Sequence, residues 1–238
     1  MALDYTLLLV EFDSPLAEPW ESPLWRETQT IELSEFHPAS SPHRPLARAK
    51  LLYSRDALHL RFFVADRYVL SRHTQYQESV YLDSCVEFFV QPRGDGGYFN
   101  FEINCGGTLL LYYIEDATRT PDGFARFTKV ARELGDQVEI IHSLPEVVFP
   151  EDPCPMDWQI ACKIPRNVLE AYAGPLGVWA GQVWRANFYK CADESSHPHW
   201  ASWAPIGEPL NFHQPSCFAP LRFATPTKEY TDEPIDHS

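Results

Sequence analysis

The chain has 238 residues, with 33 acidic against 19 basic side chains and a formal net charge of −14. Nucleic acids and anionic membranes bind positively charged surfaces, so this balance argues against both as partners. Hydrophobic residues make up 45% of the chain, which is enough for a buried core, and the 7 Trp, 11 Tyr and 15 Phe favour β-structure.

Targeting signals are not visible in the sequence. The N-terminus lacks the basic segment and apolar run of a signal peptide, and no stretch approaches the roughly 20 apolar residues of a membrane-spanning helix. We therefore expect a cytoplasmic protein, or an extracellular one if the sequence is a processed form. The six cysteines form no CxxC pair, so we expect small buried side chains, although an even number also permits disulfides.

The first part of the chain predicts three strands and one long loop. A short strand at Tyr5–Val10 precedes an irregular segment, 11–41, that contains four prolines. Two further strands, Leu46–Ser54 and Leu58–Asp66, are joined by the short turn 55–57.

The strongest folding signal is a pair of consecutive β-hairpins between residues 79 and 113. The strand Val86–Gln91 is followed by a loop rich in Gly and Pro, which end strands. The strand Tyr98–Cys105 alternates strictly, and Gly106–Gly107 offers a two-residue turn into Thr108–Ile114.

The polar face of this meander is where we expect a site. Closing the first hairpin symmetrically places Glu87 opposite Glu102 and Phe89 opposite Asn100. Two directly opposed carboxylates repel each other unless a cation, a shared proton or a ligand hydroxyl lies between them.

The second half predicts further strands and one short helix. Ala125–Ala131 and Gln137–His142 form a candidate hairpin, and Asp157–Ile164 is a strand. Pro165 favours the start of a helix at Arg166–Tyr172. Val183–Lys190 alternates again, with Arg185, Asn187 and Tyr189 on one face, and Cys217–Phe223 closes the fold.

About ten or eleven short strands punctuated by turns predict an all-β sandwich. No repeat, low-complexity segment or linker divides the chain, so we expect a single domain over residues 1–238, with a frayed polar tail at 225–238.

Several segments together resemble carbohydrate-binding module family 9. Asp83–Phe89 resembles the DS-x-E-x-F strand of that family, and Tyr98–Asn104 followed by Gly resembles its next strand. Ile164-Pro165, Trp184–Lys190 and Phe212–Phe218 resemble the helix start, a late strand and the terminal FH-x-P-x-x-F segment. The resemblance runs from about residue 46 to 223.

The resemblance implies a jelly-roll-type β-sandwich that binds saccharides without catalysis. In xylanase-attached members a sugar end lies between two Trp rings, polar side chains contact its hydroxyls, and structural calcium is present. Tyr81 stands where one of these Trp residues is expected, and Trp200 and Trp203 are candidates for the second.

A saccharide site needs aromatic faces for the C–H side of the ring and polar groups for its hydroxyls. The polar strand faces supply the following candidates: Glu87, Asn100, Glu102, Arg185 and Asn187. We expect Arg185 to be the counter-ion of Glu87 or Glu102, because its fork matches a carboxylate. The predicted partner is a mono- or oligosaccharide.

Two other functions stay open at this point. Glu87 and Glu102 are also the residue types that a glycoside hydrolase needs in a pair. Alternatively, the aromatic surface serves as a scaffold that binds protein.

Metal sites are less well supported by the sequence. His197 and His199 form a lone H-x-H in a loop, and we interpret it as exposed polar residues. No cofactor is required, but calcium is compatible with loop carboxylates such as Asp83, Asp95 or Asp116, because hard cations take oxygen ligands.

Overall fold

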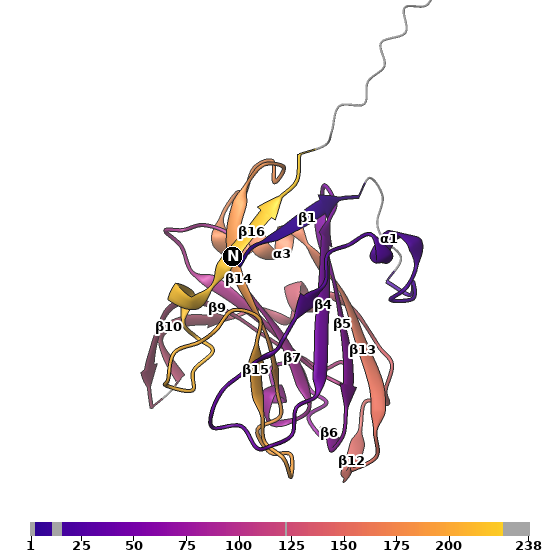
Figure 1. Ribbon diagram of the computed structural model, residues 1–238. Coiled ribbons are helices and arrows are strands. Elements are labelled where there is room, and N and C mark those ends of the chain that lie inside the picture. The colour runs from indigo at the N-terminus through magenta and orange to yellow at the C-terminus, as the bar shows by residue number, and fades with distance from the viewer. Residues whose placement is uncertain (1–2, 11–15, 122, 226–238) are drawn as a thin grey trace, which may run out of the picture.

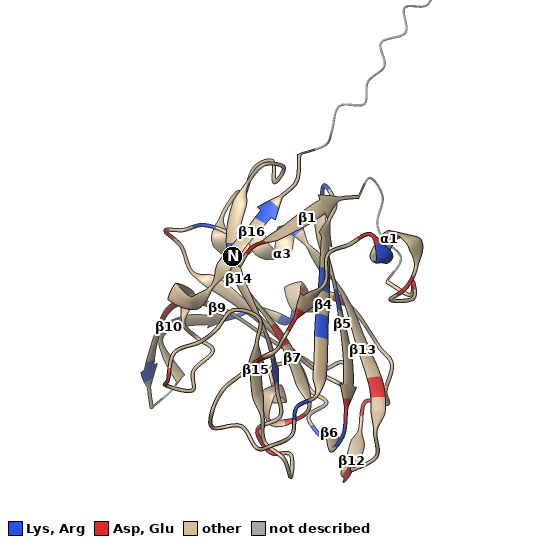
Figure 2. Ribbon diagram, in the orientation of Figure 1, with Lys and Arg blue, Asp and Glu red and all other residues tan. Residues whose placement is uncertain are grey.

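The computed structural model describes residues 3–10, 16–121 and 123–225, so the predicted tail lies outside the described residues except for Thr225. Two β-sheets face each other, and a single strand belongs to both (Figure 1). The all-β sandwich prediction is therefore confirmed. Acidic and basic residues are scattered over both sheets and the loops (Figure 2).

The first sheet carries the predicted meander. Its strand order is β10 (Gly123–Lys129), β9 (Leu109–Thr120), β8 (Tyr98–Asn104), β7 (Cys85–Gln91), β14 (Val183–Cys191), β16 (Ala219–Phe223) and β1 (Tyr5–Leu9).

The second sheet packs against the first and begins at the same β1. Its order is β1, β4 (Leu46–Tyr53), β5 (Ala57–Asp66), β13 (Met156–Pro165) and β11 (Glu139–His142). Tyr5–Leu7 pair in parallel with β16, whereas Leu8 and Leu9 pair with β4, so β1 joins the two sheets.

Short elements complete the described fold. The additional strands are β2 (Ile31–Glu32), β3 (Glu35–Phe36), β6 (Val69–Ser71), β12 (Val148–Asp152) and β15 (Trp200–Ser202). The helices are α1 (Pro23–Arg26), η1 (Val80–Leu82), α2 (Arg132–Gly135), α3 (Arg166–Ala173) and η2 (Pro215–Cys217). The predicted helix is α3, and the larger strand count comes from short pieces inside segments predicted as loops.

The register of the meander is the one that parity predicts. Glu87 pairs with Glu102 and Phe89 pairs with Asn100 across β7 and β8. The turn into β9 needs Gly107, whose φ is +88° and where an added Cβ would lie 2.5 Å from the His142 ring. A side chain there meets both backbone strain and a steric clash.

One predicted hairpin is wrong. The segments predicted as partners, 125–131 and 137–142, correspond to β10 and β11, which lie at opposite ends of the strand order. β10 extends the first sheet on β9, and β11 pairs with β13 in the second. The helix α2 between them carries the chain from one sheet to the other, so proximity in sequence misidentifies the partners.

The core between the sheets depends on stacked aromatic rings. Phe188 of β14 stacks on Phe88 with centroids 4.9 Å apart and meets Phe62 of the second sheet at 6.3 Å. Trp203 closes the same group at 5.7 Å from Phe188. All four residues are buried.

We expect Phe188→Ala to lower the free energy of unfolding by about 3–5 kcal/mol, because it removes a ring that contacts both sheets and leaves a cavity. Urea denaturation followed by fluorescence measures the change. Val178→Ala is the control, since Val178 is 79% exposed, and we expect it to change stability by less than about 0.5 kcal/mol. Equal effects of the two substitutions would contradict this account of the core.

Candidate functional site

The opposed carboxyl groups of Glu87 and Glu102 lie on the face of the first sheet that points away from the sandwich core. Each has its own neighbour. Cys191 Sγ donates to Glu87 Oε1 at 3.1 Å, and Asn100 Nδ2 donates to Glu102 Oε1 at 2.8 Å. The other oxygen of Glu102, Oε2, is buried and has no hydrogen-bond partner among the described residues.

Burial shifts both carboxyl groups toward their protonated forms. Desolvation, followed by the effect of Cys191, raises the pKa of Glu87 well above its usual range. Burial likewise raises the pKa of Glu102 to about 8, against the opposing hydrogen bond from Asn100. Near neutral pH the two groups are therefore mainly neutral, which removes the repulsion that opposed carboxylates would otherwise experience.

A cavity of about 410 Å³ opens above these two residues. This volume lies within the range of pockets that hold small ligands. Polar groups at the cavity are Ser79, Glu87, Asn100, Glu102, Arg119, Lys129, Asp193, Asn211 and His213, and its aromatic walls are Tyr81, Tyr112, Phe124, Phe127, Trp200 and Phe212.

The walls come from strands β9 and β10, the short helix η1, the start of β15 and the loop that carries Phe212. Tyr81 lies on η1 and is 37% exposed. Its carbonyl accepts from the Asp193 amide at 3.2 Å, while Asp193 Oδ1 accepts from Trp200 Nε1 at 2.7 Å. These contacts fix Tyr81 and Trp200 relative to the sheet.

Five of the eight residues predicted for binding line this cavity: Tyr81, Glu87, Asn100, Glu102 and Trp200. The other three lie elsewhere. Trp203 packs into the sandwich core, and Asn187 is fully buried, where it donates to the Ala204 carbonyl at 2.9 Å.

The expected ion pair of Arg185 with a cavity carboxylate is wrong. Arg185 is exposed and donates to the backbone carbonyls of Phe218 and Ser216, at 2.6 and 3.3 Å from Nη2. It pairs in register with Gln91, four residues along β14 from the level of Glu87. Arg185 therefore holds the C-terminal segment against the sheet.

Other cavity residues were not predicted. Tyr112 lies opposite Asn100 across β8 and β9, so extending the parity argument by one strand would have found it. Arg119 lies beyond the predicted end of the third strand, because β9 continues to Thr120, and Phe124 lies on β10, one residue before the predicted start of that strand. Phe212 belongs to the FH-x-P-x-x-F segment, but the sequence does not show that this segment covers the cavity.

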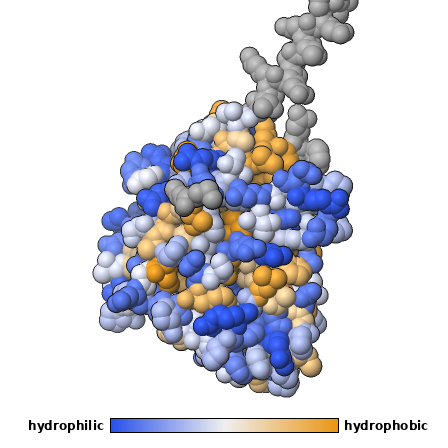
Figure 3. Space-filling model, in the orientation of Figure 1, coloured by the Kyte–Doolittle hydropathy of each residue, from blue (hydrophilic) through white to orange (hydrophobic). Residues whose placement is uncertain are grey.

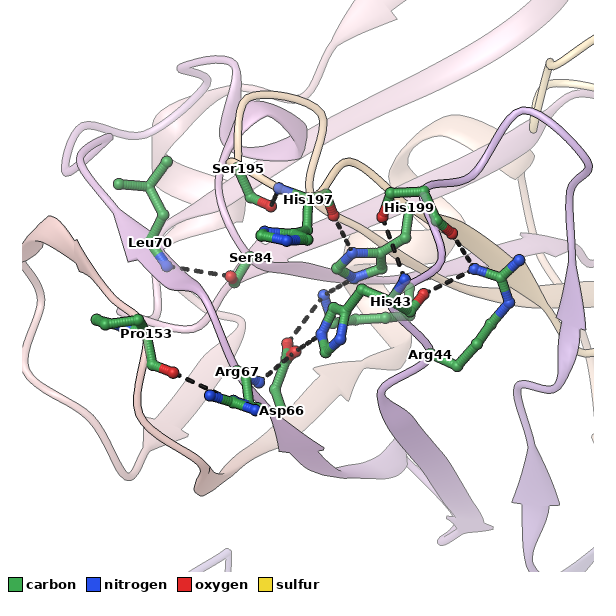
Figure 4. Close-up of polar contacts among 12 residues, drawn as sticks. His43, Arg44, Asp66, Arg67, Leu70, Ser84, Pro153, Ser195, His197 and His199 are labelled. Carbon is green, nitrogen blue, oxygen red and sulfur yellow. Dashed lines mark hydrogen bonds and ion pairs between the residues drawn. The ribbon is translucent and has the colours of Figure 1, made fainter.

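A second polar cluster, which includes His43, Asp66 and His199, joins the two sheets (Figure 4). Lys190 Nζ lies 3.3 Å from Asp66 Oδ2, and His43 Nε2 lies 2.7 Å from Asp66 Oδ1. Lys190 also donates to His199 Nε2 at 2.8 Å. Removing one partner of a buried ion pair leaves the other charge uncompensated. Each of these three contacts therefore depends on the presence of the others.

The interpretation of His197 and His199 as exposed residues is wrong for His199, which is 1% exposed. Burial, together with Lys190, lowers the pKa of His199 to about 3, so its ring is neutral. Its Nδ1 bonds to the His197 carbonyl at 2.9 Å, and both ring nitrogens are thus engaged within the protein.

Of the three carboxylates predicted for calcium, Asp83 lies in a hydrogen-bonded network, and calcium binding stays a prediction. Asp83 is buried and accepts from the backbone amides of Arg72 and His73, both at 3.0 Å, and from Asn104 Nδ2 at 2.9 Å. Within the described ranges, the one group of three potential metal-ligating side chains consists of Cys85, Glu87 and Cys191.

Fold and cavity together define a β-sandwich with a ligand-sized pocket on the outer face of one sheet. The family model of carbohydrate-binding family 9 matches residues 26–223. The chain belongs to this family, as the motif series predicted. No curated protein matches it significantly.

Solved structures with the same fold support this assignment. A candidate carbohydrate-binding protein from Bacteroides uniformis is 27% identical, with a TM-score of 0.79 over 92% of this chain and 98% of that one. A family 9 module from Caldicellulosiruptor kristjanssonii in complex with cellotriose is 15% identical, with a TM-score of 0.58 over 99% of this chain and 100% of that one. The module from the same organism in complex with glucose is 13% identical, with a TM-score of 0.55 over 96% and 100%.

None of the helices in the described part of the chain is both long and apolar enough to cross a membrane.

We expect the neutral burial of His199 to lower stability as the pH drops from about 6.5 toward 3, by up to about 1.4 kcal/mol per pH unit. Glu87 and Glu102, whose pKa values burial raises, act in the opposite direction over part of this range. The folded pKa of His199 is about 3, below its unfolded value, so only the unfolded state binds the proton in this window. Urea denaturation at pH 7, 6 and 5 measures how stability changes with pH, and His199→Gln should lose less stability than the wild type between pH 7 and pH 5. A slope that His199→Gln leaves unchanged would contradict this assignment.

Proposed function

We propose that this chain binds a saccharide non-catalytically in the cavity above Glu87 and Glu102. The observation that carries the proposal is the combination of a polar floor with half-exposed aromatic walls. Asn100 and Glu102 lie side by side on the floor, and Tyr81, Tyr112 and Trp200 stand around it. The two kinds of surface match the two kinds of group on a sugar ring.

Sugar hydroxyls both donate and accept hydrogen bonds, and the floor supplies groups for either role. Glu102 lines the cavity, and its buried Oε2 has no hydrogen-bond partner among the described residues, so a rotation of the carboxyl group toward the cavity would let a ligand hydroxyl pair with it. A buried polar group left unpaired costs free energy, which a bound hydroxyl would recover. Arg119 and Lys129 add exposed donors at the cavity edge.

The walls supply flat apolar faces for the C–H side of the ring. Aromatic side chains bring large contact areas at low conformational cost, and Tyr and Trp tolerate partial exposure to water. Tyr112 is half-buried, and neighbouring aromatic rings support it from the cavity wall, with Phe127 at 5.2 Å. A pre-formed wall of this kind lowers the cost of ordering the site on binding.

Membership of carbohydrate-binding family 9 supports the same proposal. Two structural neighbours were solved with cellotriose and with glucose, which makes glucose and its β-linked oligomers the first ligands to test.

Hydrolysis fits the geometry less well than binding. Glycoside cleavage needs one protonated and one ionised carboxyl, so the environments must push the two pKa values apart. Burial raises the pKa of both Glu87 and Glu102, so the two environments shift the carboxyl groups in the same direction rather than apart.

A protein-binding surface also has less support. On the face drawn in Figure 3, apolar side chains form separate small patches divided by hydrophilic residues. Stable protein interfaces use larger continuous areas.

We expect Tyr112→Ala to weaken saccharide binding by about tenfold or more, equivalent to ~1.4 kcal/mol, because it removes one aromatic wall. Isothermal titration calorimetry with glucose and cellotriose, extended to a glycan array, measures the affinity. Phe149→Ala is the matched control, since Phe149 is 66% exposed and does not line the cavity. Failure of the folded wild-type chain to bind any sugar at millimolar concentration would overturn the proposal.

A further inference from the structure

Two cysteines and a glutamate meet at the inner end of the cavity. Cys85 and Cys191 are directly opposite each other in the register of β7 and β14. Glu87 follows Cys85 by two residues and therefore points to the same face. One ligand atom from each of the three side chains lies within 4.8 Å of the other two.

We propose that Cys85, Glu87 and Cys191 form a binding site for a thiophilic divalent cation, with Zn²⁺ as the best match. Sulfur and carboxylate oxygen are both zinc ligands, with bond lengths of about 2.3 and 2.0–2.2 Å. Tetrahedral coordination at these lengths places two sulfurs about 3.8 Å apart. The ligand atoms are already within 4.8 Å, so small side-chain rotations complete the site.

The donor set selects against the calcium that the family resemblance suggests. Calcium takes six to eight oxygen ligands, whereas two of the three donors here are sulfur. Thiolates favour zinc and other soft metals over calcium and magnesium. The calcium prediction and the proposed zinc site are therefore independent of each other.

The electrostatic surroundings favour a cation at this place. Cys85, Glu87 and Cys191 are all at least 98% buried, and the carboxyl group of Asp193 lies close enough to add negative potential. Without a metal, burial, followed by the effects of Cys85 and Asp193, raises the pKa of Cys191 well above that of a free thiol. The side chains then remain protonated and neutral.

Metal binding exchanges protons for the ion. Two thiols and one carboxyl group lose up to three protons, and the resulting three negative charges bind one Zn²⁺, which leaves a net charge of −1. No oxidant or reductant takes part. After the exchange, the negative charges lie on the atoms that coordinate the ion. Buried charges are tolerated when they coordinate a metal in this way.

An access route is present as well. Glu87 and Cys191 both line the cavity, so an ion can reach them from solvent. Three protein ligands leave the fourth tetrahedral position free. Water fills it in the simplest case. The site does not depend on saccharide binding, because Tyr112 and the other aromatic walls take no part in it.

Cobalt(II) titration tests the proposal. The full-length chain is reduced, stripped of metal with a chelator and titrated with Co²⁺, which reports thiolate ligation through a sulfur-to-metal charge-transfer band. We expect one equivalent to bind, Zn²⁺ to displace it, and native mass spectrometry to show one zinc per chain. Cys85→Ser and Cys191→Ser should each weaken binding by about 100-fold or more, since even the loss of an outer-shell partner typically costs up to that.

Cys162→Ser is the matched control, because Cys162 is equally buried but lies on β13 in the other sheet. If the serine variants do not fold by circular dichroism, Glu87→Gln provides the second test and should also weaken binding. Tyr112→Ala should keep the cobalt band, which separates this proposal from the saccharide proposal.

Three outcomes would overturn the proposal. The first is the absence of a charge-transfer band in the folded, reduced wild type, and the second is a band that survives in the Cys85→Ser/Cys191→Ser double variant. The third is a Cys85–Cys191 disulfide that forms on air oxidation, in a protein that binds no metal after the disulfide is reduced.

Discussion

The two-sided burial of β7 is the constraint on which the rest of the structure depends. Alternation along this strand sends Val86 and Phe88 into the sandwich core and turns Glu87 to the opposite face. That opposite face is also covered, so polar groups on it are buried and must find partners. Stability of the sandwich and chemistry of the cavity are thus two consequences of one strand register, since a shift by one residue would exchange the faces.

Local patterns predicted the part of the site that one hairpin builds. The Gly- and Pro-rich loop fixes how β7 and β8 pair, and parity then places Glu87 opposite Glu102 and Asn100 beside them. The failure at Arg185 has a simple cause: parity assigns a residue to a face but not to a position along it. Arg185 lies four residues from the level of Glu87, about 13 Å along the strand at about 3.3 Å per residue.

Contacts between distant segments were beyond the reach of sequence patterns. His199 lies in a polar loop, yet His43, Asp66 and Lys190 bury it from three other places in the chain. The wrong hairpin has two causes: β10 pairs with β9, the strand directly before it, after a Pro-Asp-Gly turn signal that was not used, whereas β11 pairs with β13, a strand that local turn signals do not identify. The family resemblance supplied the fold class, but the covering of the cavity by Phe212 required the structure.

The neighbouring residues Lys190 and Cys191 serve different halves of the molecule. Lys190 reaches between the sheets to Asp66, while Cys191 points into the cavity. Inserting or deleting a single residue in β14 before them would send an ammonium group into the cavity and a thiol between the sheets. We therefore expect β14 to change during evolution by substitution and not by insertion or deletion. Tyr81 lies on η1, Trp200 at the start of β15 and Phe212 in a loop, so changes in the length of the loops around these residues offer the route by which this scaffold acquires new ligands.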